Sequence, residues 1–317
     1  MAPKILISDK IEAVCPESFK RAGFEVDEKS GLTPEALGEI IGGYHGLVVR
    51  SATKVTSEIL EKGAAGNLKI VGRAGAGLDN IDGAAAQRLN VKVVNTPGLN
   101  ANAVAELTIG LIIILARKLW PAMESIKAGR WEKKNLGGYE IAGKTIGLLG
   151  LGAVGKLVAA KAIGLGLKVL AYDPIIGQKA IEAVGAQAVG FEELFKLSDY
   201  LSLHLPKTKE TANIVDAKVL ALMKPTSYLI NCARGGLVDE GALYAALKEK
   251  RLAGAATDVF DKEPPDPMPL MELANFVAIP HLGASTQEAQ LAVAEKVALL
   301  IIGYLNGGEL SGLAGGV

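Results

Sequence analysis

The feature that most constrains the fold of this chain is a regular alternation of two kinds of segment. Short runs rich in β-branched residues are separated by stretches of helical period such as 56–62 and 80–89. In the first hundred residues these runs are KILIS, GLVVRS, LKIVGRA and VKVVNT. This alternation predicts βαβ units, and therefore parallel strands covered by helices.

The same alternation resumes after WEKKNLGGYE and predicts a second sheet that begins near residue 144. Its expected strands are KTIGLLG, KVLAYD, YLSLHLP, SYLINCA, AGAATDVF and FVAIPH. Between the two sets, residues 100–119 are apolar almost all round, which predicts a buried crossover helix capped by Asn100 or Asn102. The last amphipathic segment, 285–308, is not needed by the second sheet, so we expect it to return to the first domain.

Length and composition limit the classes of function. A chain of 317 residues is long enough for two domains, and 34 Lys and Arg balance 34 Asp and Glu, so neither nucleic acid nor a membrane surface is an expected partner. The most apolar run, LTIGLIIILA, is shorter than the roughly 20 residues that span a bilayer, and we expect it in the core or in a subunit interface.

The cysteines and the N-terminus predict a cytoplasmic protein. Cys15 and Cys232 form neither a disulfide framework nor a metal-binding spacing, so we expect a reducing compartment and no metal. The N-terminal MAPKILISDK lacks the pattern of a secretory signal.

A glycine pattern lies between the first strand of the second set and the helix that follows it. Gly150, Gly152 and Gly155 form G-x-G-x-x-G around Ala153 and Val154. In that context the pattern predicts dinucleotide binding, with the pyrophosphate at the helix N-terminus, although any glycine-rich αβ turn could look similar. Asp173 ends the next strand, where a carboxylate binds ribose hydroxyls and repels a 2′-phosphate, so NAD is favoured over NADP, with Lys179 as the nearby cation that weakens this preference.

Three polar residues follow predicted strands of the second set: Arg234 in NCARGG, Glu263 in DVFDKEPP and His281 in IPHLGAST. They suit oxidation of a 2-hydroxy acid, because histidine can take the hydroxyl proton, a carboxylate can orient the imidazole, and a guanidinium can hold the substrate carboxylate. Taken singly, each has a structural alternative: a satisfied histidine, a surface glutamate, or an ion pair of Arg234 with Asp239. His45 and His204 lack this setting, although His204 could line a cofactor groove.

At these residues the sequence resembles the D-isomer-specific 2-hydroxyacid dehydrogenase family. The resemblance covers nearly the whole chain, through motifs that include VRSATKVT, GRAGAGLDNID, VVNTPGLNANAVAEL, LGLGAVGK, YDP, NCARGGLVDEGAL, DVFDKEPP and PHLGASTQEAQ. It implies an α/β fold of two doubly wound parallel-sheet domains. A Rossmann NAD domain (100–285) would be inserted into a flavodoxin-like substrate domain (1–99 and 286–317), and NAD domains would pair in a homodimer.

The resemblance also implies roles for individual residues. His281 would be the acid/base, Glu263 its partner and Arg234 the anchor of the substrate carboxylate and carbonyl, while Asp258 would bind the nicotinamide amide. The expected cofactor contacts are Ala76, Gly150, Gly152, Ala153, Val154, Gly155, Asp173, Pro206, Thr211, Cys232, Ala233, Arg234, Asp258, His281, Gly283 and Ala284. The expected substrate contacts are Arg50, Ser51, Arg73, Gly75, Ala76, Gly77, Arg234 and His281.

Within the family, the resemblance is strongest to members that oxidise 3-phospho-D-glycerate to 3-phosphohydroxypyruvate, the first step of serine biosynthesis. Arg50 and Arg73 could hold the phosphate, with Lys133 and Lys134 as weaker candidates, and backbone amides of Gly75 to Gly77 could form a nest for the substrate carboxylate. Ala76 replaces a threonine that relatives often carry. The ending LSGLAGGV implies a short form without a C-terminal regulatory domain, so serine feedback through such a domain is not expected.

Two other functions remain open at this point. One is reduction of glyoxylate or hydroxypyruvate by the same three residues, in which case a substrate phosphate would not be required. The other is an NAD-sensing, corepressor-like binding protein, which would need little or no turnover.

Overall fold

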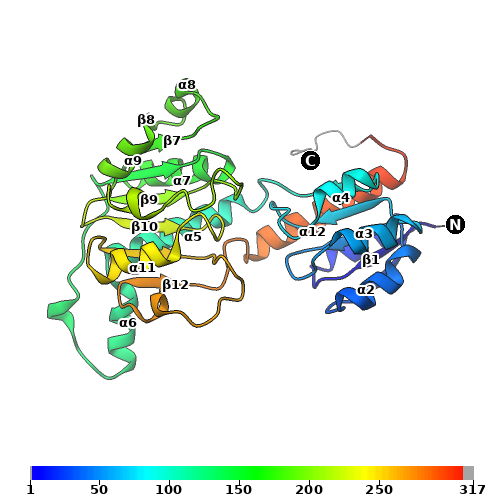
Figure 1. Cartoon of the computed structure of the whole chain (residues 1–317), viewed down its shortest axis with the longest axis horizontal. Coiled ribbons are helices and arrows are strands. Elements are labelled where there is room, and N and C mark those ends of the chain that lie inside the picture. Colours follow the sequence, from blue (N-terminus) through cyan, green and yellow to red (C-terminus); the bar gives the residue numbers. More distant parts are fainter. Residues whose placement is uncertain (1, 310–317) are drawn as a thin grey trace. The chain divides into compact units, whose positions relative to one another are not determined.

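A computed structural model describes residues 2–309 of the chain. The chain divides into two compact units, Met1–Asn100 with Ala284–Val317, and Ala101–Gly283. These boundaries lie within two residues of the predicted ones, although residues 310–317 of the predicted first domain lie outside the described part. Figure 1 shows the C-terminal helix α12 among the N-terminal elements, so the first unit is built from both ends of the chain.

The first unit contains a five-stranded sheet in which every pairing is parallel, with the order β2-β1-β3-β4-β5. This is the flavodoxin-like order, as predicted. Its strands are β1 Lys4–Ile7, β2 Glu25–Glu28, β3 Gly46–Val49, β4 Ile70–Arg73 and β5 Lys92–Val94. Its helices are α1 Val14–Arg21, α2 Pro34–Ile40, the 3-10 turn η1 Ile41–Gly43, α3 Ser57–Ala64, α4 Gly83–Arg88 and α12 Gln287–Leu305.

Each face of this sheet has its own core. Residues that alternate along β1 go to opposite sides: Leu6 packs with the α2–α4 side, whereas Ile5 and Ile7 pack with α1 and α12. Gly72 on β4 allows α12 to approach closely, because a Cβ there would lie 2.6 Å from side-chain carbons of Val297 and Ile301. The C-terminal helix therefore completes the core of the N-terminal sheet.

The second unit contains a seven-stranded, all-parallel sheet in the order β12-β11-β10-β9-β6-β7-β8. Numbered from its own first strand, this is the Rossmann order with one additional edge strand. Its strands are β6 Thr145–Leu149, β7 Lys168–Tyr172, β8 Gln187–Ala188, β9 Tyr200–Leu203, β10 Tyr228–Asn231, β11 Gly254–Thr257 and β12 Phe276–Ala278.

Helices cover both faces of this second sheet (Figure 1). Side chains of α5 and α7 share one core with the sheet, and those of α9, α10 and α11 share the other. The helices are α5 Ala101–Ala116, α6 Leu119–Lys127, α7 Ala153–Gly164, α8 Gln178–Glu182, α9 Phe191–Leu197, α10 Ala217–Leu220 and α11 Glu240–Lys248, with 3-10 turns η2 Lys133–Asn135 and η3 Pro269–Glu272.

The predicted helix over residues 100–119 is wrong in its C-terminal part. The structure ends α5 at Ala116 and begins α6 at Leu119, because Lys118 adopts the left-handed conformation with φ +50°. Of the two predicted caps, Asn100 directly precedes α5, whereas Asn102 lies inside the helix and its side-chain amide donates to Glu106 at 2.8 Å. The apolar segment forms a buried helix, as expected, and packs against α7 on one face of the sheet.

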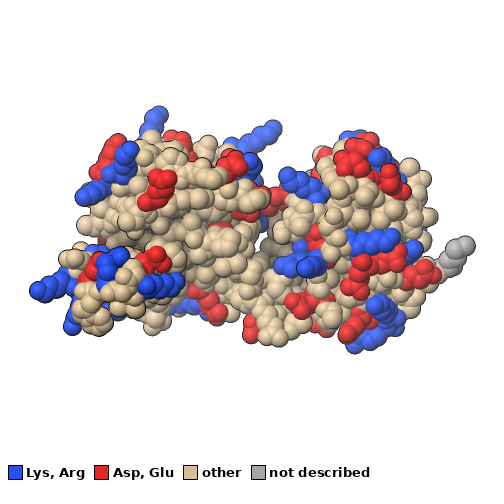
Figure 2. Space-filling view, turned by 90° about the horizontal axis from the view of Figure 1, so that it is seen from below, with Lys and Arg blue, Asp and Glu red and all other residues tan. Residues whose placement is uncertain are grey.

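Charge does not divide the surface visible in Figure 2 into large areas of one sign. On the face shown in Figure 2, basic and acidic side chains are interspersed on each unit. Within residues 2–309 no helix combines the length and the apolar character needed to span a bilayer.

Candidate active site

The G-x-G-x-x-G turn connects β6 to α7, and each of its glycines has a separate physical reason. Gly150 has φ +96°, and a Cβ there would lie 2.9 Å from the backbone of His204. A Cβ on Gly155 would lie 2.5 Å from the carbonyl oxygen of Gly150, so the third glycine lets the helix pack on the turn. A Cβ on Gly152 would project into open space at the start of α7, a helix whose N-terminus has no side-chain cap. This combination fits the pyrophosphate of a dinucleotide, which approaches the backbone at a helix N-terminus.

Asp173 follows β7 and closes the same turn. Its carboxylate accepts hydrogen bonds from the backbone N–H groups of Leu151 at 2.8 Å and of Ile175 and Ile176 at 2.9 Å each. Burial alone would raise the pKa of Asp173, but these hydrogen bonds and the charge of Lys156 outweigh it, and the pKa is lowered. The group is therefore a carboxylate at neutral pH, as the predicted contact with the ribose hydroxyls requires.

Two polar atoms beneath this turn have no hydrogen-bond partner among the described residues, Ser202 Oγ and His204 Nε2. Burial lowers the pKa of His204 from 6.5 to about 4, so its ring is neutral at physiological pH. Cys232, a predicted cofactor contact at the end of β10, is also buried, and burial raises the pKa of its thiol to about 12. The thiol is therefore protonated and unsuited to nucleophilic chemistry.

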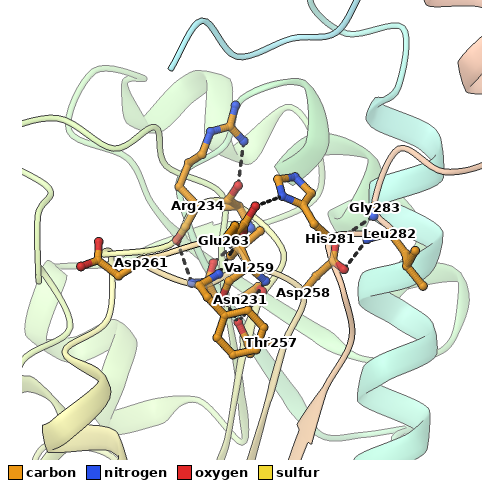
Figure 3. A network of polar contacts seen from close by, with 12 residues as sticks. Asn231, Arg234, Thr257, Asp258, Val259, Asp261, Glu263, His281, Leu282 and Gly283 are labelled. Atoms are coloured by element: carbon orange, nitrogen blue, oxygen red, sulfur yellow. Dashed lines mark hydrogen bonds and ion pairs between the residues drawn. The ribbon is translucent and has the colours of Figure 1, made fainter. Parts of the chain in front are cut away.

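Arg234, Glu263 and His281 follow β10, β11 and β12, which are consecutive neighbours in the sheet. Parallel strands end at the same edge, and Figure 3 shows these three residues grouped there. The structure thus brings together three residues that lie 29 and 18 positions apart along the chain.

The turn that carries Arg234 is fixed by Asn231, the last residue of β10. The Asn231 side-chain amide donates to the Arg234 carbonyl at 2.9 Å, and its oxygen accepts from Ala233 N at 3.1 Å. Arg234 is half-buried rather than buried, and its guanidinium donates to the Ala233 carbonyl at 2.7 Å. Asp239 caps α11 by accepting from Ala242 N.

Glu263 and His281 form the shortest polar contact of the group. Glu263 Oε2 lies 2.6 Å from His281 Nδ1, while Glu263 Oε1 accepts from the backbone N–H of Phe260 at 3.0 Å. A carboxylate only accepts hydrogen bonds, so the neutral ring carries its proton on Nδ1 and presents the lone pair of Nε2. The ring is 47% exposed, which leaves that nitrogen accessible to a ligand.

Asp258 holds the turn on which His281 lies, as the dashed lines of Figure 3 show. Its two carboxylate oxygens accept from Leu282 N at 2.5 Å and Gly283 N at 2.7 Å, and its carbonyl accepts from His281 N at 2.9 Å. His281 has φ +51°, a conformation that costs energy in a non-glycine residue and persists when surrounding contacts require it. Asp258 is 1% exposed, and burial raises its pKa although the two backbone donors act in the opposite direction.

The loop after β9 contains the predicted cofactor contacts Pro206 and Thr211. The Thr211 hydroxyl donates to the Pro206 carbonyl at 2.7 Å and accepts from Thr208 N at the same distance, so the two ends of the loop are joined. The remaining expected cofactor positions of this unit, Ala153 and Val154 at the start of α7 and Ala233 beside Arg234, lie at the same edge of the sheet.

The expected phosphate ligands Arg50, directly after β3, and Arg73, the last residue of β4, lie at the ends of neighbouring strands of the first unit, and Asn80 connects them. Asn80 donates to the Arg50 carbonyl at 2.8 Å and accepts from Arg73 Nε at 2.9 Å. The Arg50 guanidinium donates to the Lys10 carbonyl at 3.3 Å. Sequence reasoning missed Asn80 as a site residue, although it lies in the quoted motif GRAGAGLDNID.

The predicted amide nest over Gly75 to Gly77 is wrong in one member. The backbone N–H of Gly75 already donates to the Arg73 carbonyl at 3.0 Å and to Thr96 Oγ1 at 2.9 Å. The Ala76 carbonyl accepts from the Asn95 side chain at 2.6 Å. Gly75 therefore shapes this turn instead of offering its amide to a substrate.

For the other predicted site residues, their positions in the structure do not by themselves indicate a role. Ser51 is exposed after β3, Gly77 and Ala284 are half-buried in the first unit, and Lys133 and Lys134 are exposed in η2 of the second unit. Across residues 2–309, no three His, Cys, Asp or Glu side chains form a group that could hold a metal ion.

Comparison with known proteins agrees with this geometry. Residues 109–283 match the family profile described as D-isomer specific 2-hydroxyacid dehydrogenase, NAD binding domain. The curated D-3-phosphoglycerate dehydrogenase of Synechocystis sp. is 45% identical over 295 residues, which are 93% of this chain and 53% of that protein. This chain thus spans about half the length of that relative.

Solved structures resemble the chain over nearly its whole length. The NAD⁺-bound 3-phosphoglycerate dehydrogenase of Entamoeba histolytica is 30% identical with a TM-score of 0.83, over 99% of both chains. A glyoxylate reductase from Paecilomyes thermophila is 28% identical with a TM-score of 0.90, over 99% of this chain and 98% of that one. The family profile covers more than half of this sequence, and the chain belongs to the D-isomer specific 2-hydroxyacid dehydrogenase family, with its second unit as the NAD-binding domain.

Proposed function

We propose that this protein is an NAD-dependent dehydrogenase that oxidises 3-phospho-D-glycerate to 3-phosphohydroxypyruvate, the first step of serine biosynthesis. The observation that supports the chemistry is the contact of Glu263 with His281 beside the Arg234 turn, at the ends of three neighbouring strands. The curated relative of Synechocystis sp., with 45% identity, supports the choice of substrate.

In the proposed reaction, His281 Nε2 takes the proton of the C2 hydroxyl. Glu263 accepts a hydrogen bond from Nδ1–H of the same ring, which orients the imidazole and stabilises its protonated form once the substrate proton has been taken. The Arg234 guanidinium binds the substrate carboxylate and polarises the C2 oxygen. The glycine turn and Asp173 would hold NAD, which would supply the acceptor for the hydride that leaves C2.

The proposed phosphate ligands are Arg50 and Arg73, which Asn80 joins through hydrogen bonds. Arginine suits this role because its planar fork matches phosphate oxygens. A large rise in KM for 3-phosphoglycerate is therefore expected for Arg50→Ala. Arg88→Ala is the matched control. Arg88 lies in the same unit, at the end of α4, and forms an ion pair with Glu61 of α3.

The decisive experiment follows NADH formation by absorbance with 3-phospho-D-glycerate, D-glycerate, D-lactate and glycolate. We expect the phosphorylated substrate to be preferred, and we expect His281→Ala to lose turnover while it still binds NAD, because general acid/base catalysis contributes about 10²–10⁴-fold. Near-normal activity of His281→Ala would contradict the assigned role of the histidine.

The same assay separates the two other functions. A glyoxylate or hydroxypyruvate reductase would prefer unphosphorylated substrates and would be insensitive to Arg50→Ala. An NAD-sensing binding protein would bind NAD with little or no turnover of any of these acids.

We also propose that the protein forms a homodimer through its NAD-binding unit. Helix α6 and the following loop extend from the body of this unit (Figure 1). They expose large apolar side chains, as a subunit contact would require: Leu119, Trp120, Met123, Ile126, Trp131 and Tyr139. Light scattering is expected to give a dimer mass for the native chain and a monomer mass for Trp120→Lys combined with Ile126→Lys. The two cysteines are free and buried, which supports a cytoplasmic location.

A further inference from the structure

The turn that carries Arg234 and the turn that carries Glu263 touch through their backbones at Gly235. A Cβ added to Gly235 would overlap the carbonyl group of Phe260. The φ angle of Gly235 is not in the left-handed region, in contrast to its neighbour Gly236 at +73°. The φ angle of Gly235 therefore gives no reason for glycine at this position, whereas the contact with Phe260 does.

Phe260 connects this contact to the predicted acid/base pair. Its backbone N–H donates to Glu263 Oε1 at 3.0 Å, and Glu263 Oε2 meets His281 Nδ1 at 2.6 Å. A displacement of Phe260 would therefore move the carboxylate that orients the imidazole. Hydrogen bonds are lost within a few tenths of an ångström beyond their normal range, so this chain of contacts is sensitive to a small shift.

A second brace holds the other side of the Glu263 turn. Lys207 Nζ lies 2.6 Å from Asp261 Oδ1, and Asp261 N donates to Glu240 Oε1 at 3.2 Å. Lys207 follows Pro206 in the loop after β9, so the ion pair joins that loop to the Glu263 turn. The two side chains are 40% and 62% exposed, and an exposed ion pair contributes little to stability, although it can still orient the turn.

We propose that Gly235 is a positioning residue for the acid/base pair. The missing Cβ lets the Phe260–Glu263 turn close against the Arg234 turn, and this contact sets the Glu263 carboxylate at hydrogen-bonding distance from His281. Lys207 and Asp261 are the second, weaker brace. The kinetic test of this inference rests on the proposed function. The position of Glu263 relative to His281 can be tested without turnover.

The test compares Gly235→Ala with Gly164→Ala. Both variants add one methyl group within the NAD-binding unit, and a Cβ on Gly164 meets nothing within 4 Å. We expect kcat of Gly235→Ala to fall by about 10- to 100-fold, since misplacement by 1 Å can cost about 100-fold, while KM for NAD changes less than about twofold. Gly164→Ala is expected to match the wild type.

The pH profile distinguishes positioning from a merely structural role. Asp258 and Glu263 are the acidic groups that act on His281. A carboxylate that moves away stabilises the protonated imidazole less, so the acidic limb of the kcat profile of Gly235→Ala is expected to move to lower pH. A structural role alone would lower the melting temperature and leave the kcat profile unchanged, and that result would overturn the proposal.

A second variant keeps the proposal testable if Gly235→Ala fails to fold. Asp261→Asn removes one charge of the exposed brace, and we expect kcat to fall by about threefold, the scale of one exposed ion pair, with the same direction of shift in the pH profile. Asp261→Glu retains the charge and is expected to restore kcat. Wild-type kinetics in Asp261→Asn, together with an unfolded Gly235→Ala, would overturn the proposal.

One readout is independent of catalysis. The chain has three histidines, so the ring ¹⁵N signals of His281 can be assigned and followed against pH in wild type and Gly235→Ala. A shift of that titration to lower pH supports the positioning role even if no substrate is turned over, whereas identical titrations would overturn it. Absence of turnover in the wild type would contradict the proposed function and leave this comparison intact.

Discussion

His204 makes the stability of the NAD-binding unit depend on pH in a direction that can be calculated. Burial lowers its pKa from 6.5 to about 4, and its Nε2 atom has no partner among the described residues. Between these two values the unfolded chain binds a proton on this ring that the folded chain does not bind. The free energy of unfolding therefore falls as the pH is lowered from 6.5 toward 4.

The expected size follows from the same two values. Proton linkage gives a loss of about 2 kcal/mol between pH 7 and pH 5 from this one ring. In His204→Gln the titrating group is absent, so the variant should lose about 2 kcal/mol less than the wild type over that interval. Its stability at pH 7 can differ in either direction, because the prediction concerns only the change with pH.

Urea unfolding at pH 5, 7 and 8, followed by far-UV circular dichroism, measures this difference. Between pH 7 and 8 the ring is mostly neutral in both states, so the two chains should change nearly in parallel, which provides an internal control. Equal losses of stability in both chains between pH 7 and 5 would refute the reasoning, since they would mean that burial does not oppose protonation of His204.

Three further predictions concern Asp258, Asp173 and Cys232 in the NAD-binding unit and Cys15 in the first unit. Asp258→Asn places an amide nitrogen against a backbone N–H of the His281 turn, so we expect a loss of about 1–3 kcal/mol in the free energy of unfolding, measured with urea, and a lower kcat. Asp173→Ala removes the carboxylate of the glycine turn, so the dissociation constant of NAD, measured by calorimetry, should rise by about 10- to 100-fold while kcat at saturation changes little. Burial raises the pKa of Cys15 and Cys232 to about 12, so both thiols should resist iodoacetamide at pH 8 in the folded protein and react after unfolding, and mass spectrometry that finds either one alkylated in the native state would contradict this.

The parts of the fold that could be predicted are those with a strong local signal. Apolar strands such as 145–149 and 228–231 are short β-branched or apolar runs between turn residues, and the glycine turn has its own pattern. Strand β2, with the sequence EVDE, was not predicted, because an edge strand needs no apolar run and is specified by its pairing with β1. The break at Lys118 was also missed, although Pro121 in the first turn of α6 cannot donate a helical hydrogen bond to the carbonyl of Arg117 and so marks it.

The candidate site shows the same limit. The residue types and their order after predicted strands indicated Arg234, Glu263 and His281, because parallel strands end at one edge of a sheet. Contacts between distant residues could not be predicted in this way. Two such contacts depend on how the loops pack. Asp258 accepts a hydrogen bond from Leu282 N, 24 residues later, and Thr96 Oγ1 accepts one from Gly75 N.

The return of α12 to the first unit has a consequence for the order of biosynthesis. Val293, Val297 and Ile301 fill the face of the N-terminal sheet formed by Ile5, Val48 and Ile70. A ribosome releases that sheet and α1 early but α12 late, so part of this apolar face must stay uncovered while the whole Ala101–Gly283 unit is translated. The N-terminal sheet is therefore synthesised first but completes its core last. A chaperone that shields apolar surface would have to stay bound longest to this N-terminal part of the chain.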